Sequence, residues 1–252
     1  MRRIRFLLIL APWLLAAQER DAALIDAARK GDLAAVERLL EAGANPSARE
    51  KDTLRPALSV AAVAGHPGLV KALAAKAASP NEADKFGYPP LVWAVWSQRP
   101  SAPEVIRTLM GLGADPDLAG SDGKAAPWVA AELESPEKLE ALLSGGLSVN
   151  WRNRHQETLL AIASAQGRVK AVQLLLERGA NVNTRDDEGF TPLLNACQNA
   201  HLEVVRLLIA KGADRAAKSK YGDTALSLVQ TKYDDTQAGR TRRAIAELLR
   251  EP

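Results

Sequence analysis

The sequence predicts an all-α protein built as an array of stacked helix–turn–helix units. Short blocks of similar composition begin at positions 43, 77, 113, 146, 179 and 212, so neighbouring blocks are 33 to 36 residues apart. A period of this length is typical of arrays in which each unit buries its apolar face against its neighbours. The composition agrees, because aromatic residues make up only 4% of the chain, whereas alanine and leucine, which favour helices, are plentiful.

The stretch 186–214 shows how one unit is expected to fold. Its first helix begins at Pro192, where the missing N–H costs nothing, and Gly212 follows the second helix, where glycine adopts a left-handed backbone most easily. The stretches DDEG (186–189) and DKFG (84–87) predict tight turns that project as fingers. The second helix is expected to bury an apolar stripe, formed by Val204, Val205, Leu207 and Leu208.

This unit closely resembles the ankyrin repeat, whose pattern is G-x-T-P-L-H-x-A-A-x-x-G-H-x-E-x-V-x-x-L-L-x-x-G-A-D. The matching residues are Gly189, Thr191, Pro192, Leu193, Ala196, His201, Glu203, Val205, Leu207, Leu208, Gly212, Ala213 and Asp214. The resemblance covers about residues 21–252 and implies a solenoid of stacked helix pairs with β-turn fingers. The expected units are about 21–50, 51–83, 84–119, 120–152, 153–185, 186–218 and 219–252.

Cys197 and His201 lie four positions apart among carboxylates, but repetition of the pattern favours a structural role for both. Cys197 occupies the small, buried position filled by Ala62, Ala131 and Ser164 in other units, and His201 matches the turn histidine of the ankyrin pattern. The three histidines and the single cysteine are dispersed, so they form no zinc-ligand set. No nucleophile elbow or phosphate-binding glycine loop is present. We therefore predict no catalytic, cofactor-binding or metal-binding residue, and we expect that the protein is not an enzyme.

Residues 1–17 are similar to a secretory signal peptide, because arginines precede a short apolar run that ends in two alanines. The run is too short to span a bilayer core of about 30 Å, and Pro12 argues against a long regular helix. We expect cleavage after Ala17 and export, in a bacterium to the periplasm, which leaves residues 18–252 as the mature repeat domain. The alternatives are a buried N-terminal helix, an uncleaved anchor, or a cytoplasmic scaffold whose N-terminus is never cleaved.

The charge balance gives no support for nucleic-acid binding. The chain has 33 basic and 30 acidic side chains, hence a net charge of +3. Three of the basic residues lie within residues 1–17, so the mature chain would be close to neutral, without the concentrated positive surface that nucleic acids require. We expect a monomer that has no membrane span in its mature part.

The resemblance implies a protein-binding scaffold that acts through its concave face and turn tips. Aromatic residues and arginine concentrate binding energy at such surfaces. Trp93 is expected to be core, and Trp128 and Trp151 could be either core or interface. By analogy with the family, the candidate partner-binding residues are Phe86, Tyr88, Trp96, Ser97, Lys124, Arg154, His155, Phe190 and Tyr221.

Two further functions stay open at this point. The third and fourth units are irregular in sequence and could form a small-ligand or enzymatic pocket, which a polar cavity with converging carboxylates there would favour. The chain could also be an accessory or protective factor for a periplasmic enzyme. Repeat arrays bind diverse partners on similar frames, so the sequence does not separate this function from general protein binding.

Overall fold

The computed structural model describes the backbone of residues 2–230 and 237–250, and the side chains of residues 16–230 and 237–250. Within these ranges the chain forms fourteen helices and no strand, which confirms the predicted all-α class. The chain divides into two compact halves, residues 1–126 and 127–252. Each half is described by itself below.

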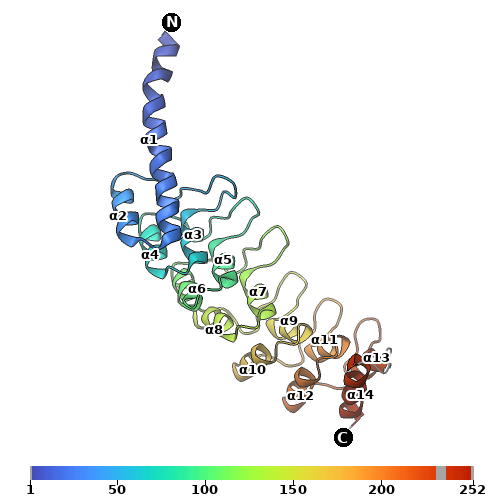
Figure 1. Cartoon of the computed structure of the whole chain (residues 1–252). Helices are drawn as coiled ribbons and strands as arrows, with labels where there is room; N and C mark the ends of the chain where they lie inside the picture. Colours follow the sequence, from blue (N-terminus) through green and yellow to red (C-terminus); the bar gives the residue numbers. More distant parts are fainter. Residues whose placement is uncertain (1, 231–236, 251–252) are drawn as a thin grey trace. The chain divides into compact units, whose positions relative to one another are not determined.

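The N-terminal half consists of two rows of helices. Helices α1, α3 and α5 pack side by side, and α2, α4 and α6 form the second row against them (Figure 1). Each helix of the first row is followed in the chain by its partner in the second row. The bounds are α1 Arg2–Lys30, α2 Leu33–Glu41, α3 Ala57–Ala64, α4 Pro67–Ala75, α5 Pro90–Trp96 and α6 Ala102–Gly111.

The C-terminal half repeats this arrangement. Helices α9, α11 and α13 pack in one row, and α8, α10, α12 and α14 in the other. Residues 231–236 and 251–252 of the expected last unit lie outside the described residues. The bounds are α7 Ala126–Glu132, α8 Pro136–Ser144, α9 Leu159–Ala165, α10 Val169–Glu177, α11 Pro192–Gln198, α12 Leu202–Ala210, α13 Ala225–Gln230 and α14 Gln237–Arg250.

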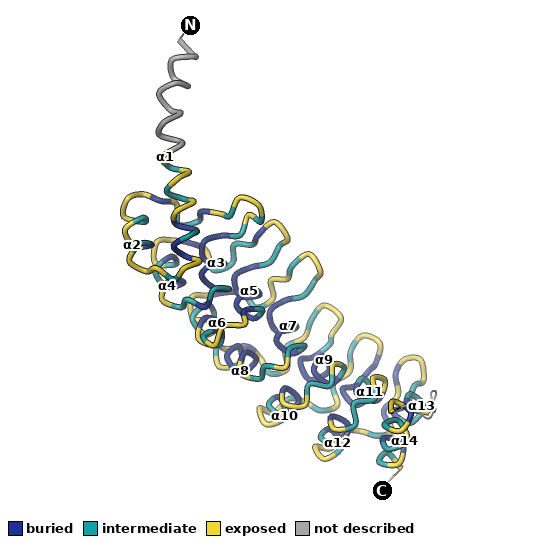
Figure 2. The backbone as a smooth tube through the Cα atoms, viewed as in Figure 1, coloured by how far each residue is buried: buried dark blue, intermediate teal, exposed yellow. Residues whose placement is uncertain are grey.

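The helices of the first row form most of the core in each half. All residues of 57–62 in α3 and of 159–164 in α9 are buried (Figure 2). Most of these side chains are small or aliphatic, which lets neighbouring helices approach closely. In α12 the buried stripe differs from the prediction, because Val204, Val205 and Leu208 are buried but Leu207 is only half-buried. Leu207 lies at the edge of the stripe, about 60° around the helix from Val204.

Fingers precede the helices of the first row and are joined to one another by hydrogen bonds. At the base of four fingers, an isolated antiparallel β-bridge joins the two ends of the finger. The bridged pairs are Arg49–Pro56, Ala119–Ala125, Arg152–Thr158 and Lys218–Thr224. At the tips, the backbone N–H of one finger donates to a carbonyl of the finger before it. These bonds are Lys85 to Thr53 (3.1 Å) and Ser121 to Phe86 (2.9 Å) in the N-terminal half, and Asp187 to His155 (3.2 Å) and Lys220 to Glu188 (2.9 Å) in the C-terminal half.

Within each half, arginine and asparagine side chains connect neighbouring repeats. The Arg49 guanidinium donates to the Ala83 carbonyl (2.9 Å) and the Arg152 guanidinium to the Arg185 carbonyl (3.0 Å). Asn183 donates to the carbonyl of Gly212 (3.1 Å) and accepts from the N–H of Asp214 (2.8 Å). Asn81 makes the equivalent pair of bonds with Gly113 and Asp115. These bonds account for the asparagines at the ends of two of the repeated blocks, Asn81 and Asn183.

Helix α1 begins near the start of the chain and includes Pro12, so the expectation that Pro12 prevents a long helix is wrong. A proline removes one backbone hydrogen bond, but the flanking leucines and alanines are strong helix formers. The part of α1 that packs on the array carries the buried residues Leu24, Ile25, Ala27 and Ala28. No described helix is both long enough and apolar enough to cross a membrane.

Cys197 and His201 have structural roles, as predicted. Cys197 is fully buried, and its burial raises the pKa of the thiol to about 12. The His201 ring lies within hydrogen-bond distance of the Ala165 carbonyl (3.0 Å). The ring also covers Gly167, where an added Cβ atom would lie 2.5 Å from His201 Nδ1. His201 therefore closes the turn of the preceding repeat.

The two leucines of α12 give a matched test of the core. Leu208→Ala removes a fully buried side chain and should lower the free energy of unfolding by about 2–5 kcal/mol. Leu207→Ala removes a half-buried one and should cost about 1 kcal/mol. Urea unfolding followed by circular dichroism measures both, and equal losses would contradict the described packing.

Candidate functional site

Three aromatic side chains of the N-terminal half form one cluster, which we call the aromatic cluster: Tyr88, Trp93 and Trp96. The ring centroids are 4.7 Å apart for Tyr88 and Trp96, 5.3 Å for Trp93 and Trp96, and 6.1 Å for Tyr88 and Trp93. The interplanar angles of 71° to 79° place ring edges against ring faces, which is a favoured geometry for aromatic pairs. All three residues are half-buried.

Arg55 covers one face of the cluster. Its guanidinium carbon lies 3.6 Å from the centroid of the Trp93 ring, close enough for a cation–π interaction. Arg55 stands at the base of the preceding finger, directly before Pro56 and α3. Glu50 of the same finger lies 3.9 Å from the guanidinium. Arg55, a residue of the preceding repeat, thus packs on the face of the Trp93 indole.

Asp84 holds the cluster at the N–H edge of Trp93. Its side chain is only 6% exposed. One carboxylate oxygen accepts hydrogen bonds from the backbone N–H groups of Phe86 (2.9 Å) and Tyr88 (3.0 Å). The other oxygen accepts from the indole N–H of Trp93 (3.1 Å). A single carboxylate therefore joins the finger that carries Tyr88 to the helix that carries both tryptophans.

Tyr88 is also fixed by the next finger. Its ring lies directly over Gly120, where an added Cβ atom would be 1.9 Å from Tyr88 Cε1. Desolvation of the phenol, followed by the charge of Asp122 and a hydrogen bond to it, raises the pKa of Tyr88. Glycine at position 120 is therefore needed for space rather than for a left-handed backbone.

The predicted residues of the N-terminal half have different surroundings. Tyr88 and Trp96 meet in the cluster, Phe86 is 47% exposed at its fingertip, and Lys124 is half-buried on the next finger. Because Tyr88 and Trp96 are packed against each other, truncating them would also cost stability. Ser97 is only 2% exposed, since its hydroxyl donates to the Val63 carbonyl (2.8 Å). The expectation that Ser97 is an exposed contact is wrong.

In the C-terminal half, exposure also differs among the predicted residues. Arg154 and His155 are exposed on one finger, where Arg154 Nε donates to His155 Nε2 (3.2 Å), and Tyr221 is 71% exposed. Phe190 is only 7% exposed, and its backbone N–H donates to the Asp186 carboxylate of its own finger (2.8 Å). The expectation that Phe190 is an exposed contact is therefore wrong. Trp128 and Trp151, which the sequence left undecided, are both half-buried.

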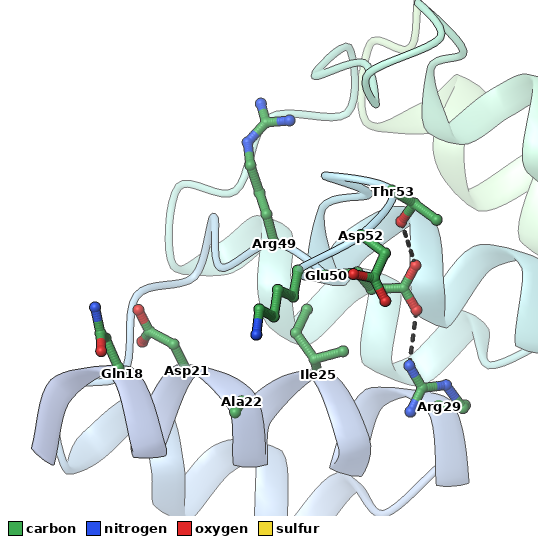
Figure 3. Close-up of a pocket in the computed structure, with 10 residues that line it drawn as sticks. Gln18, Asp21, Ala22, Ile25, Arg29, Arg49, Glu50, Asp52 and Thr53 are labelled. Carbon is green, nitrogen blue, oxygen red and sulfur yellow. Dashed lines mark hydrogen bonds and ion pairs between the residues drawn. The ribbon is translucent and has the colours of Figure 1, made fainter. Parts of the chain in front are cut away.

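A groove of about 800 Å³ lies between α1 and the first finger (Figure 3). Burial alone would raise the pKa of Glu50 in this groove, but hydrogen bonds from Thr53 (2.6 Å) and Arg29 (2.7 Å) outweigh it and hold the pKa below its usual range. Glu50 is thus part of an internal network. The lining residues are Gln18, Asp21, Ala22, Ile25, Arg29, Arg49, Glu50, Lys51, Asp52 and Thr53.

Converging carboxylates at the third and fourth units would favour the pocket alternative. A hollow of about 440 Å³ at the third unit lies between α4 and α6, and it has one carboxylate, Glu104, beside Lys71 and Arg107. Among the residues whose side chains are described, no group of three or more histidine, cysteine, aspartate or glutamate side chains is placed to hold a metal ion. The third unit carries the aromatic cluster, with Arg55 and Asp84 as its charged neighbours.

Sequence reasoning did not identify Arg55 and Asp84. The position of Asp84 at the start of a DKFG turn indicates a turn-capping role, but its second bond depends on Trp93, nine residues along the chain. Arg55 reaches Trp93 from a different repeat. No short motif encodes either contact, whereas a search for polar residues spaced around the tryptophans could have proposed them.

The raised pKa of Tyr88 makes a prediction about pH. The phenol should ionise above the ordinary value of about 10, as measured by the absorbance difference at 295 nm between the parent chain and Tyr88→Phe. Because the pKa of Tyr88 is higher in the folded state than in the unfolded state, ionisation of the phenol lowers the free energy of unfolding. The stability contributed by the neutral phenol is present below the unfolded-state pKa and is lost as the pH rises through the folded-state pKa. Ionisation of Tyr88 at or below pH 10 would contradict the described surroundings of the phenol, its desolvation first and its contact with Asp122 second.

Comparisons with known proteins identify the repeats. The family model described as ankyrin repeats (3 copies) matches residues 24–119, and that described as ankyrin repeats (many copies) matches residues 159–209. Protein PhlB of Serratia liquefaciens is 43% identical over 79 residues, which are 31% of this chain and 34% of PhlB. That match therefore spans about a third of the relative's length.

Two solved structures resemble almost the whole chain. The ankyrin repeat domain of Bcl-3, described as a unique member of the IkappaB protein family, is 27% identical with a TM-score of 0.75, over 91% of this chain and 98% of that one. The human ASB11 ankyrin repeat domain is 26% identical with a TM-score of 0.72, over the same shares. With the helix pairs, the fingers and matches to both halves, the chain belongs to the ankyrin-repeat family.

Proposed function

We propose that this chain is a non-catalytic scaffold that binds a partner protein through the fingers and first-row helices of residues 49–125, with the aromatic cluster at the centre of the contact. Ankyrin repeats are generally protein-interaction scaffolds. The observation that carries the proposal is the gathering of Tyr88, Trp93 and Trp96 at one half-buried position. Tyrosine and tryptophan are the residues that most often dominate binding energy at protein interfaces.

The cluster is also held in a way that suits binding. Arg55, Asp84 and Gly120 each restrict one of its rings through a cation–π contact, a hydrogen bond or close packing. A surface that is already ordered loses little conformational entropy when a partner binds. Phe86 and Lys85 extend the surface at the fingertip, where the Lys85 ammonium lies 4.9 Å from the Phe86 ring centroid.

Photo-crosslinking tests this site on the full chain in its native cells. We expect p-benzoylphenylalanine in place of Phe86, which is 47% exposed beside the cluster, to give a discrete adduct with one protein. The same probe in place of Lys71, exposed on α4 in the second row, should not give it. The captured protein, once identified and purified, should bind the chain directly. Equal adducts at both positions, or none at Phe86, would contradict the proposed surface.

We propose further that the protein is exported and that residues 1–17 are removed. The contacts that seat α1 involve residues beyond the expected cleavage point. Arg20 donates to the Ala42 carbonyl (2.7 Å), and Asp21 accepts from the N–H of Asn45 (2.8 Å). Cleavage after Ala17 would leave both bonds and the buried residues of α1 in place. N-terminal sequencing of the native protein should therefore begin at Gln18, whereas a start at Met1 would contradict removal of the segment.

A further inference from the structure

We propose that Asp84 is the positioning residue of the aromatic cluster: its carboxylate sets the orientation of Trp93 and, through that ring, the surface that Tyr88 and Trp96 present to a partner. The inference rests on the proposed function, because it assigns a role in binding to a residue that is itself buried. Asp84 acts through other residues and touches no partner directly.

The two oxygens of the Asp84 carboxylate have separate tasks. Oδ1 caps the finger by accepting the N–H groups of Phe86 and Tyr88, and Oδ2 accepts the indole N–H of Trp93. Hydrogen bonds to a charged acceptor are stronger than neutral ones, and they strengthen further away from water. Trp93 is thus fixed at its N–H edge by Asp84 and at its face by Arg55, with opposite charges on the two sides.

Other fingers show that capping does not require the second oxygen. Asn153, Asp186 and Ser219 each accept two backbone N–H groups of their own finger through one side-chain oxygen. The residues nine positions further on, which correspond to Trp93, are Ile162, Asn195 and Leu228. The side chains of Ile162 and Leu228 carry no hydrogen-bond donor, and among the described residues the Asn195 side chain makes no hydrogen bond to Asp186. The second bond of Asp84 is therefore an addition to the repeat that goes with the aromatic cluster.

This comparison supplies a precise variant. Asp84→Asn keeps an oxygen for the finger, as Asn153 shows, but turns an amide NH₂ group towards the indole N–H of Trp93. Two donors then face each other, so the Trp93 ring loses its anchor. Asp186→Asn is the matched control, because Asp186 makes the two capping bonds on a finger whose helix has no tryptophan at the corresponding position.

The orientation is measured without any partner by NMR of the full chain labelled with ¹⁵N-tryptophan, in which Trp93→Phe identifies the Trp93 indole resonance. We expect Asp84→Asn to shift this resonance. The indole N–H of Trp93 should also exchange with solvent about tenfold faster, because it loses one hydrogen bond to a charged acceptor. Asp186→Asn should leave it unchanged. An indole resonance that is the same in Asp84→Asn and in the parent chain would overturn the proposal.

The effect on binding is measured as the adduct yield from p-benzoylphenylalanine at position 86, with thermal unfolding as a check on folding. The yield should fall about tenfold in Asp84→Asn and stay at the parent level in Asp186→Asn. In a Trp93→Phe background, Asp84→Asn should cause no further loss, because the two residues act through one bond. Additive losses, or equal losses for both asparagine variants, would overturn the positioning role.

The two proposals fail in different ways. If the parent chain gives an adduct that Trp96→Ala abolishes but Asp84→Asn leaves intact, the binding surface stands and the role of Asp84 is wrong. If the parent chain gives no adduct at position 86, the proposed function fails and the role of Asp84 in binding fails with it. The NMR result then reports only how Asp84 holds Trp93.

Discussion

The hydrogen bonds that join neighbouring fingers within each half are the interactions on which the rest of the structure depends. A single helix pair cannot bury both of its apolar faces, so each repeat needs a neighbour in register. Backbone bonds between fingertips and side-chain bonds such as Arg49 to Ala83 supply this register. Because each bond spans one period, residues at equivalent positions are brought side by side within each half.

The aromatic cluster uses this register for a second purpose. Its neighbours come from three consecutive fingers, since Arg55, Asp84 and Gly120 each belong to a different one. The alignment of the fingers therefore also aligns the rings, and little motion is left to lose on binding. The same frame leaves Phe86 exposed at a tip. The proposed binding surface would therefore combine a fixed centre with a more accessible edge.

The repeat period, the helix pairs and the structural roles of Cys197 and His201 could be predicted from sequence, because they depend on local patterns that recur. The exposure of single side chains could not. Phe190 is only 7% exposed although the family pattern suggested a contact residue there. Ser97 is buried because its hydroxyl meets the Val63 carbonyl of another repeat, a contact that its sequence position does not reveal. Asp84 and Arg55 were missed for the same reason, since their contacts with Trp93 form only when the fingers and helices are folded together.

The central claim is that residues 49–125 bind a partner through their fingers and the first-row helices. Hydrogen–deuterium exchange tests it most directly, on the chain alone and in complex with the purified protein captured at position 86. We expect slower exchange of the backbone amides at residues 84–97 and 119–125 in the complex, and unchanged exchange in α4 and α6. Protection confined to α4 and α6, or to the fingers of the C-terminal half, would contradict it.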